Sequence, residues 1–251
     1  MKVAVITPYH KEPIWKLERC HQSVRQQTDT CTHFLIADGH PRDEIRSWDC
    51  QHIILPIEHN DNGNTPRGIG SLCAMNEGYD AIFYLDADNW YQEDHVTSAL
   101  YTHQATAADV VFSYRHVVFP DGEIMEADDP EDISHSHVDT SCMVIFRSAY
   151  RALSQWCQMP QELGPRCDRV MFSQLVSEFN CAWSEHKSVY FETWYRNHFR
   201  MAGKETPENA RKWIPMNPDQ FETLNQSYAL RSYRPCFFEQ ETEGSKSPFK
   251  W

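Results

Sequence analysis

The sequence predicts an α/β fold in which a mostly parallel central sheet is flanked by helices. Through the first 112 residues, short apolar runs alternate with apolar residues at helical spacing. This alternation is typical of βαβ units and a parallel sheet. Hydrophobic residues make up 41% and charged residues 24% of the 251 residues, as in ordinary globular proteins. We therefore expect one domain that spans residues 1–251.

Five strands and three helices are expected in this first part. The strands are predicted at residues 3–6, 33–37, 52–57, 81–85 and 110–112. The helices are predicted from apolar stripes at Leu17/Cys20/Val24, Ile69/Leu72/Cys73 and Val96/Ala99/Leu100/His103. Ligands of such sheets bind beyond the carboxyl ends of the strands. Residues 7–9, 38–39 and 86–88, which follow three of the strands, should therefore lie on one rim.

The pattern changes after residue 113. Residues 114–127 resemble a hairpin around residues 120–122, and the acidic stretch 128–139 is expected to be an exposed loop. An apolar run follows at 142–146, a helix is predicted over 168–179, and a strand over 189–194. A short helix near 207–213 and a frayed tail at 239–251 complete the prediction.

Charge and cysteine content restrict the partners and the compartment. The net charge of −13 disfavours nucleic acid and anionic lipid as main partners. No apolar run is long enough for a transmembrane segment, and no secretory signal is recognised. The nine cysteines are odd in number and lack CxxC spacing, so we expect thiols in a reducing cytoplasm. The thirteen scattered histidines form no Cys/His pattern at zinc-ligand spacing.

The strongest chemical signal is a pair of acids directly after an apolar strand. Asp86 and Asp88 are two positions apart, and they can face one cavity if the chain turns there. Mg²⁺ and Mn²⁺ prefer such oxygen ligands, with phosphate and water completing the coordination. The pair therefore indicates a divalent metal site, although a loop with solvated acids has the same sequence.

Four segments together resemble family 2 glycosyltransferases, which have a GT-A fold. They are residues 3–10 (VAVITPYH), 34–40 (FLIADGH), 64–78 (NTPRGIGSLCAMNEG) and 81–89 (AIFYLDADN). Their order and spacing match that family over roughly the first 110 residues. The resemblance implies a nucleotide-sugar-binding half at 1–110, an acceptor-binding and catalytic half at 111–200, and a C-terminal extension at 201–251.

The resemblance also implies roles for individual residues toward the donor and a Mn²⁺ or Mg²⁺ ion. Asp38 is expected to read the nucleotide base, in a pocket lined by the turn at 7–9, which holds Thr7, Pro8 and Tyr9. Arg67 is expected near the nucleotide. Asp86 would contact the ribose or the metal, Asp88 would bind the metal, and His198 would be a late metal ligand, with His135 and His137 as rivals.

A general base is expected in the second half. The family places an acid at the start of a helix about eighty residues after the metal motif, and Asp168 lies 168 − 88 = 80 positions after Asp88. The alternative for such an acid is a helix-capping or first-turn residue favoured by the helix dipole. Asp139 and Glu162 are the alternatives for the base.

The function implied by the resemblance is an inverting, metal-dependent glycosyltransferase. It would move a sugar from a nucleotide-diphosphate sugar to a hydroxyl of a glycan or glycoconjugate acceptor. Trp90 and Tyr91 could line the acceptor site or pack in the core. The alternatives are a sugar-phosphate nucleotidyltransferase, which usually opens with a glycine-rich phosphate loop that residues 7–10 lack, and a non-catalytic glycan-binding relative.

Overall fold

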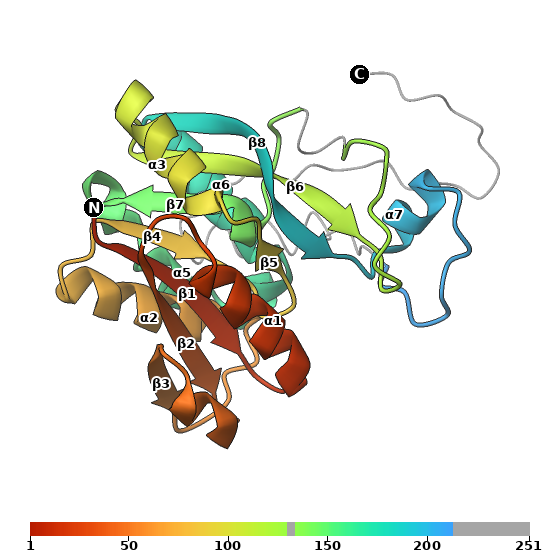
Figure 1. Ribbon diagram of the computed structural model, residues 1–251, viewed down its shortest axis with the longest axis horizontal. Coiled ribbons are helices and arrows are strands. Elements are labelled where there is room, and N and C mark those ends of the chain that lie inside the picture. Colours follow the sequence, from red (N-terminus) through yellow and green to blue (C-terminus); the bar gives the residue numbers. More distant parts are fainter. Residues whose placement is uncertain (130–133, 213–251) are drawn as a thin grey trace.

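The structure is a computed structural model that describes residues 1–129 and 134–212. Within those residues, eight strands form one sheet in the order β3-β2-β1-β4-β7-β6-β8-β5 (Figure 1). The strands are β1 (Val3–Tyr9), β2 (Cys31–Asp38), β3 (Gln51–Leu55), β4 (Ala81–Tyr84), β5 (Trp90–Tyr91), β6 (Val110–Val118), β7 (Met143–Phe146) and β8 (Cys181–Glu192). The helices are α1 (Ile14–Arg25), α2 (Asn64–Asn76), α3 (His95–Thr106), α5 (Gln155–Gln158), α6 (Cys167–Glu178) and α7 (Arg196–Met201).

The first half of the sheet is parallel, as predicted. β1 pairs with β2 and with β4, and β2 pairs with β3, all in parallel register. All seven residues of β1 and all four of β4 are buried. Strands covered on both faces need continuous apolar sequence, which explains why these runs do not alternate with polar residues. Because β2 and β4 lie on opposite sides of β1, the crevice at the carboxyl ends of β1 and β4 is the switch point where such folds bind ligands.

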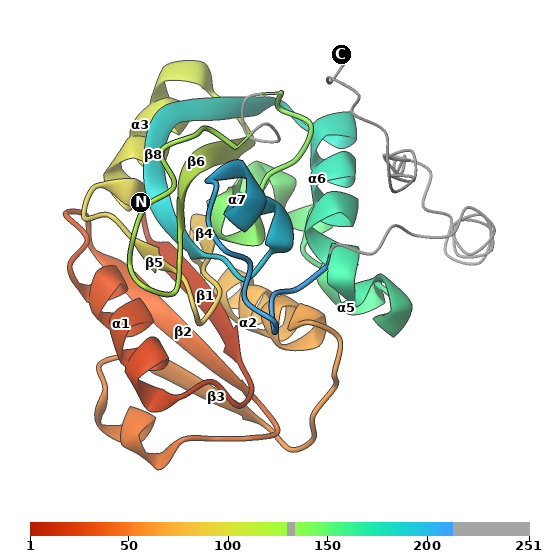
Figure 2. The ribbon, with the colours of Figure 1, turned by 90° about the vertical axis from the view of Figure 1, so that its right-hand side faces the viewer.

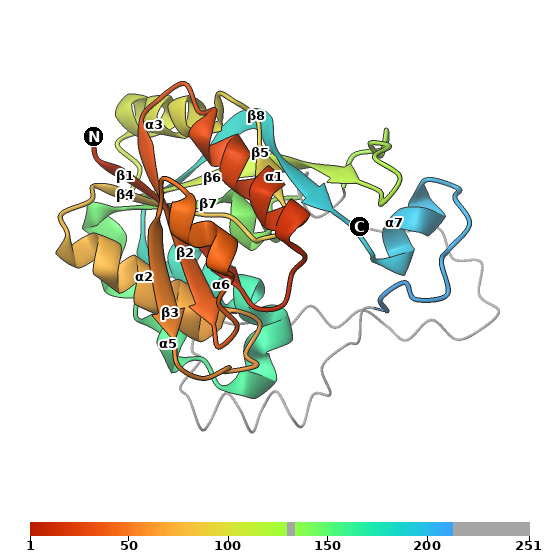
Figure 3. The same cartoon turned by 60° about the horizontal axis from the view of Figure 1, so that its bottom comes forward.

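Helices α1 and α2 lie on opposite sides of β1 and β2 (Figures 2 and 3). Helix α1 buries Leu17, Cys20 and Val24, the stripe that its sequence predicts. Helix α2 approaches the sheet closely at Gly70, where an added Cβ would lie 2.7 Å from the Ile36 side chain. Glycine is therefore needed at this position for the middle of α2 to pack closely against Ile36 of β2 and Ile6 of β1.

The second half of the sheet is mixed. β7 is antiparallel to β4 and β6, β8 is parallel to β6, and the two-residue strand β5 is antiparallel to β8. The predicted hairpin around residues 120–122 is present in a short form, because Phe119 N–H donates to Glu123 O and Met125 N–H donates to Val117 O (both 2.8 Å). Its first arm is the second half of the long strand β6, and Val118 and Ile124 form an antiparallel bridge. β8 begins well before the predicted residue 189.

Two predictions for the second half are wrong. The acidic stretch 128–139 is not simply an exposed loop, because Asp129, His137 and Asp139 are buried. Arg115 pairs with Asp129 (2.6 Å) and with Asp139 (3.4 Å), and His137 lies 3.1 Å from Asp168, contacts that the sequence pattern does not reveal. The short helix near 207–213 is absent from residues 207–212, where a turn precedes a single bridge between Tyr195 and Arg211. The predicted tail at 239–251 lies outside the described residues.

None of the helices in residues 1–129 and 134–212 combines the length and the apolar character needed to cross a bilayer.

Candidate active site

A tight turn after β4 brings the predicted acid pair together. The backbone N–H of Asn89 donates to the carbonyl oxygen of Asp86 (2.9 Å), so the chain reverses directly after Leu85. The Asn89 side chain fixes this turn by donating to Ser141 (2.9 Å) and accepting from the backbone N–H of Glu192 (3.1 Å). The turn at 86–89 is called the acid turn below. It lies at the switch point between the carboxyl ends of β1 and β4.

Asp86 is paired with Arg67, the residue that the family resemblance implies near the nucleotide. A guanidinium N–H of Arg67, on α2, donates to the Asp86 carboxylate at 2.8 Å. Arg67 is only 2% exposed, and its guanidinium lies 4.7 Å from the centre of the Trp156 ring. Another of its N–H groups donates to the side chain of Asn64 (3.3 Å). These contacts hold a cationic group in a fixed place beside the acid turn.

Asp88 lies in a strongly negative environment. Burial and the charge of Asp86 raise the pKa of Asp88 to about 7; Lys16 opposes the shift, while Glu192 and Asp139 add to it. A carboxylate that is costly to ionise beside other carboxylates is stabilised in its charged form by a nearby cation. The oxygen ligands of Asp86 and Asp88 suit a hard divalent cation such as Mg²⁺ or Mn²⁺.

Asp38, the predicted base-reading acid, is held by a histidine that sequence reasoning missed. It lies at the end of β2 and accepts hydrogen bonds from the backbone N–H of His59 (3.1 Å) and from its ring Nδ1 (2.6 Å). His59 follows β3, the neighbouring strand. The sequence contained a usable signal, because the segments that follow adjacent parallel strands must lie side by side.

The predicted turn at 7–9 is wrong, because Thr7, Pro8 and Tyr9 are the last three residues of β1 and pair with β2. They reach the expected rim, but two of their side chains point into the protein. The Thr7 hydroxyl is fully buried and bonded to His33 (2.9 Å). The Tyr9 hydroxyl bonds to His52 (2.7 Å), and burial raises the pKa of Tyr9 to about 12. Pro8 packs against the loop before α2, within about 3 Å of the position of an added Cβ on Gly63. Any contact of Thr7 or Tyr9 with a ligand at the rim would therefore use the backbone.

Two further acids lie near the acid turn. Asp139 is buried, caps the turn at 140–142 by accepting from the backbone N–H of Ser141 (2.9 Å), and pairs with Arg115 (3.4 Å). Burial raises the pKa of Asp139 to about 6; Arg115 opposes the shift, while Asp86 and Asp168 add to it. These mutual effects indicate that the predicted base and the acid turn face a common region.

Asp168 opens α6, as predicted, and is paired with a buried histidine. Ring Nε2 of His137 lies 3.1 Å from the Asp168 carboxylate. Burial opposes ionisation of Asp168, but the charge and hydrogen bond of His137 outweigh it and hold the pKa at about 2. The Asp168 side chain is 25% exposed, whereas that of Asp139 is 10% exposed. Asp168 is therefore the more accessible of the two acids.

The histidines predicted as late metal ligands are engaged elsewhere. His198, on α7, bonds through Nδ1 to Thr193 (2.6 Å), and its Nε2 faces Asp129 at 3.6 Å. His135 is exposed and stacks on Trp183. Among residues 1–129 and 134–212, Asp86, Asp88 and His198 do not form a group with ligand atoms within 4.8 Å of one another. Glu162, the third candidate for the base, is exposed on the 3₁₀ turn Gln161–Arg166.

A cavity of about 360 Å³ opens beside the acid turn. It lies between α1, β5 and the end of β8, and we call it the indole pocket. Its lining includes three indoles and three charged groups, from Trp15, Trp90, Trp194, Lys16, Arg19 and Glu192. Arg19 joins the pocket to the acid turn, because it donates to the carbonyl oxygen of Asp88 (2.6 Å). Tyr91, in contrast, is a core residue that bonds to the Tyr84 carbonyl and stacks on His95.

Comparison with known proteins identifies the fold. No protein-family model matches the sequence, and no curated protein sequence does so either. Among solved structures, the chain is similar to S. aureus TarS, a glycosyltransferase. Residues 1–349 of TarS with UDP-GlcNAc match at a TM-score of 0.61 and 11% identity, covering 92% of this chain and 66% of that one. The same fragment with UDP matches at 0.59 and 13% identity, covering 91% and 71%.

The likeness confirms the predicted fold class, a GT-A-like α/β fold with a curled sheet. The chain spans 63% of another structure of TarS residues 1–349 and 38% of the longer TarS structure. At identities of 11–13% the likeness establishes the fold, and the chemistry has to be argued from the site.

Proposed function

We propose that the protein is an inverting, metal-dependent glycosyltransferase of the family 2 type that uses a nucleotide-diphosphate sugar. The observation that carries the proposal is the acid turn at the switch point of a GT-A-like sheet, with Arg67 beside it. The four sequence segments that resemble family 2 supply the elements of this region. The TarS structures with UDP and UDP-GlcNAc make uridine nucleotides the first donors to test.

In this proposal the base binds near Asp38 and the diphosphate near the acid turn. The Asp38 carboxylate, oriented by His59, would accept hydrogen bonds from the N–H groups of a base. Arg67 would lie beside the diphosphate, and its burial would keep the guanidinium in place without further reorganisation.

The residues around Asp88 fit a divalent cation. Asp88 and Asp86 would hold Mn²⁺ or Mg²⁺ through carboxylate oxygens, and the raised pKa of Asp88 indicates a site that gains from an added positive charge. When bound, the cation would neutralise the diphosphate as it leaves. His198 is not included, because its ring is engaged with Thr193 and Asp129.

We assign the general base to Asp168. Inversion requires a group that takes the proton of the acceptor hydroxyl as that oxygen attacks the sugar carbon. Asp168 is accessible and, with a pKa of about 2, ionised at neutral pH. His137 fixes the orientation of the carboxylate. Asp139 has a pKa closer to neutrality, but its side chain is only 10% exposed, against 25% for Asp168, and it pairs with the buried Arg115.

The indole pocket is the proposed site for the glycan or glycoconjugate acceptor. Indole faces pack well on the apolar faces of sugar rings, and charged side chains between them can bond to hydroxyl groups. The pocket adjoins Asp88 through Arg19, so an acceptor bound there would lie next to the leaving diphosphate.

The proposal is tested by a thermal-shift screen of nucleotides with and without Mn²⁺, followed by a transfer assay. A ligand that binds only the folded state raises the melting temperature by mass action. We expect a uridine diphosphate to raise it more with Mn²⁺ than without. If no nucleotide stabilises the protein in either condition, the proposed function is wrong.

A further inference from the structure

We propose a second cation site, of the zinc type, formed by His10, His40 and Glu58, which follow β1, β2 and β3 on the strand rim. Within the described residues, this is the one group of three His, Cys, Asp or Glu side chains whose ligand atoms all lie within 4.8 Å of one another. The proposal does not depend on the proposed function.

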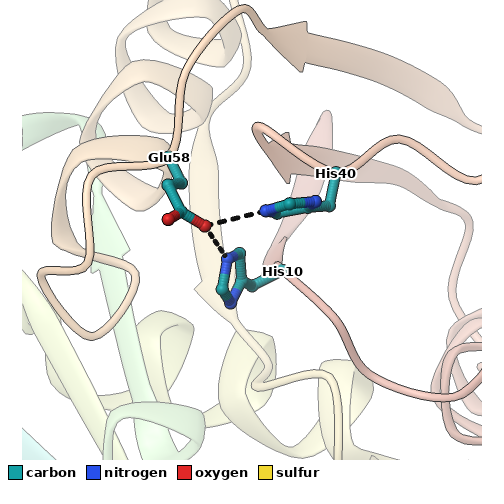
Figure 4. Close-up of side chains that lie close together, drawn as sticks. All are labelled: His10, His40 and Glu58. Carbon is teal, nitrogen blue, oxygen red and sulfur yellow. Dashed lines mark hydrogen bonds and ion pairs between the residues drawn. The ribbon is translucent and has the colours of Figure 1, made fainter.

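The three side chains converge on one point (Figure 4). Ring Nε2 of His10 and ring Nε2 of His40 each lie 2.7 Å from the same carboxylate oxygen of Glu58. The two rings meet edge to face, with centroids 4.6 Å apart. Without a cation, a hydrogen on each ring nitrogen can bond to the Glu58 oxygen. A bound metal ion would take the place of these hydrogens.

The backbone holds the ligands in place before any ion binds. His10 follows β1, His40 follows β2, and Glu58 follows β3, so three adjacent strand ends supply one ligand each. Gly39 has a φ of +76°, and an added Cβ would lie 2.6 Å from the backbone nitrogen of Glu58. Only a glycine permits this close approach, which presses the loop carrying Glu58 against the turn carrying His40.

The ligand chemistry selects a different cation from that of the acid turn. Two imidazoles and one carboxylate suit Zn²⁺ and similar transition metals, whereas carboxylates and water suit Mg²⁺ and Mn²⁺. Three protein ligands leave a fourth position for water or another ligand. The scattered histidines gave no zinc pattern in the sequence, because the ligands come from three separate βα segments.

Lys11 would compete with a cation at this position. Its ammonium lies 3.1 Å from the same Glu58 oxygen, and its side chain is 58% exposed. A side chain with that exposure can withdraw into solvent when an ion binds. Removal of the Lys11 charge should therefore strengthen metal binding, whereas removal of a ligand should weaken it.

The test uses the full chain, freed of metal with a chelator, and Zn²⁺ alone as the probe. Bound zinc is measured after dialysis, and affinity is measured by calorimetry. Wild type should bind one zinc ion per chain that excess Mg²⁺ does not displace. His40→Ala and Glu58→Gln should each weaken this binding by more than about 100-fold, since even the loss of an outer-shell partner costs 10–100-fold. Lys11→Met should bind a few-fold more tightly.

The matched control is His186→Ala, which breaks an exposed His–carboxylate pair with Asp94. It should bind zinc like wild type. Asp88→Asn should also retain zinc binding, which separates this site from the acid turn. Substitution of Co²⁺ should give an absorption spectrum without thiolate charge transfer, which excludes the cysteines as the source. Absence of stoichiometric binding, or equal binding by wild type and His40→Ala, would overturn the proposal.

Discussion

At the scale of single residues, the site is governed by carboxylates whose neighbours push their pKa values apart. The pKa of Asp88 is raised to about 7 and that of Asp139 to about 6, whereas the pKa of Asp168 is lowered to about 2. Burial raises the pKa values of Asp88 and Asp139. The charge and hydrogen bond of His137 lower the pKa of Asp168. Such separation is the usual basis for giving neighbouring acids different roles.

The first prediction concerns the pH dependence of cation binding. Below a pH of about 7 Asp88 is protonated, and a proton competes with the cation for its oxygen. Stabilisation by Mn²⁺, measured as the shift in melting temperature, should therefore grow as the pH rises from 5.5 to 8. Asp88→Asn should abolish both the shift and its pH dependence, and an unchanged profile in this variant would contradict the assignment.

The same pKa shift affects stability without metal. An ordinary aspartate in the unfolded chain has a pKa near 3.9, and the folded value for Asp88 is about 7. Between these values the folded state binds more protons than the unfolded state, so the free energy of unfolding falls as the pH rises through this window. Chemical denaturation of the metal-free protein at several pH values measures this slope, which Asp88→Asn should reduce.

The second prediction separates the base from the donor site. Asp168→Asn should lower turnover by about 10²–10⁴-fold, the usual contribution of a general base. Donor binding with Mn²⁺, measured by calorimetry, should change little. Asp139→Asn serves as the comparison, because it alters the Asp139–Arg115 pair instead. Retained turnover in Asp168→Asn would transfer the base role to Asp139 or Glu162.

The sequence could predict the part of the site that is local in the chain. Asp86, Asp88 and Asp38 follow apolar runs directly, so their positions at strand ends follow from strand order alone. The partners of these acids were missed where they come from distant segments: His59 for Asp38, His137 for Asp168 and Arg115 for Asp139. Their pairing depends on tertiary packing, which periodicity does not encode.

At the scale of elements, the indole pocket depends on a contact between the first helix and the last strand. Lys16 and Arg19 on α1 bind the carboxylate of Glu192 at the end of β8 at 2.5 Å and 2.8 Å. Burial opposes ionisation of Glu192, but hydrogen bonds from Lys16 and Arg19 outweigh it and lower its pKa. One wall of the pocket is therefore fixed by ion pairs, whereas Trp15 stays 54% exposed.

The third prediction tests this pocket. Trp15→Ala should raise the KM for the acceptor by about 2- to 12-fold, since aromatic stacking contributes about 0.5–1.5 kcal/mol. Donor affinity should be unchanged. The control is Tyr101→Ala, which removes an aromatic side chain that is 72% exposed on α3 and does not line the pocket. Equal acceptor kinetics in both variants would place the acceptor elsewhere.

Secondary-structure elements could be predicted where a strand is buried on both faces. The predictions failed where a strand pairs with a segment far away in the sequence. The parallel strands of the first half have continuous apolar runs. β8 is long, mixed in polarity and for the most part only half-buried, so its sequence resembled a short strand. In the described part of the segment predicted as a short helix near 207–213, Arg211 instead forms a bridge with Tyr195.

At the scale of the whole molecule, the cysteines allow a direct test of the expected reducing environment. None of the eight cysteines in residues 1–129 and 134–212 forms a disulfide; Cys236 lies outside that part of the chain. The fourth prediction is that denatured protein, prepared without reductant, titrates close to nine thiols. A count lower by two or more that reductant restores would contradict it. In the native protein the exposed Cys157 should react first, and Cys157→Ser should remove this fast phase.

The sheet order has a consequence for how the chain folds. The edge strand β5 belongs to the first half of the sequence, yet its partner in the sheet is β8, about a hundred residues later. The two halves inferred from the sequence therefore share one sheet, with a strand of the first half paired to a strand of the second. A fragment that ends at residue 110 would leave β5 without its partner. During synthesis, the nascent chain cannot close this edge until residue 190 has left the ribosome, so completion of the fold is expected to be late and slow.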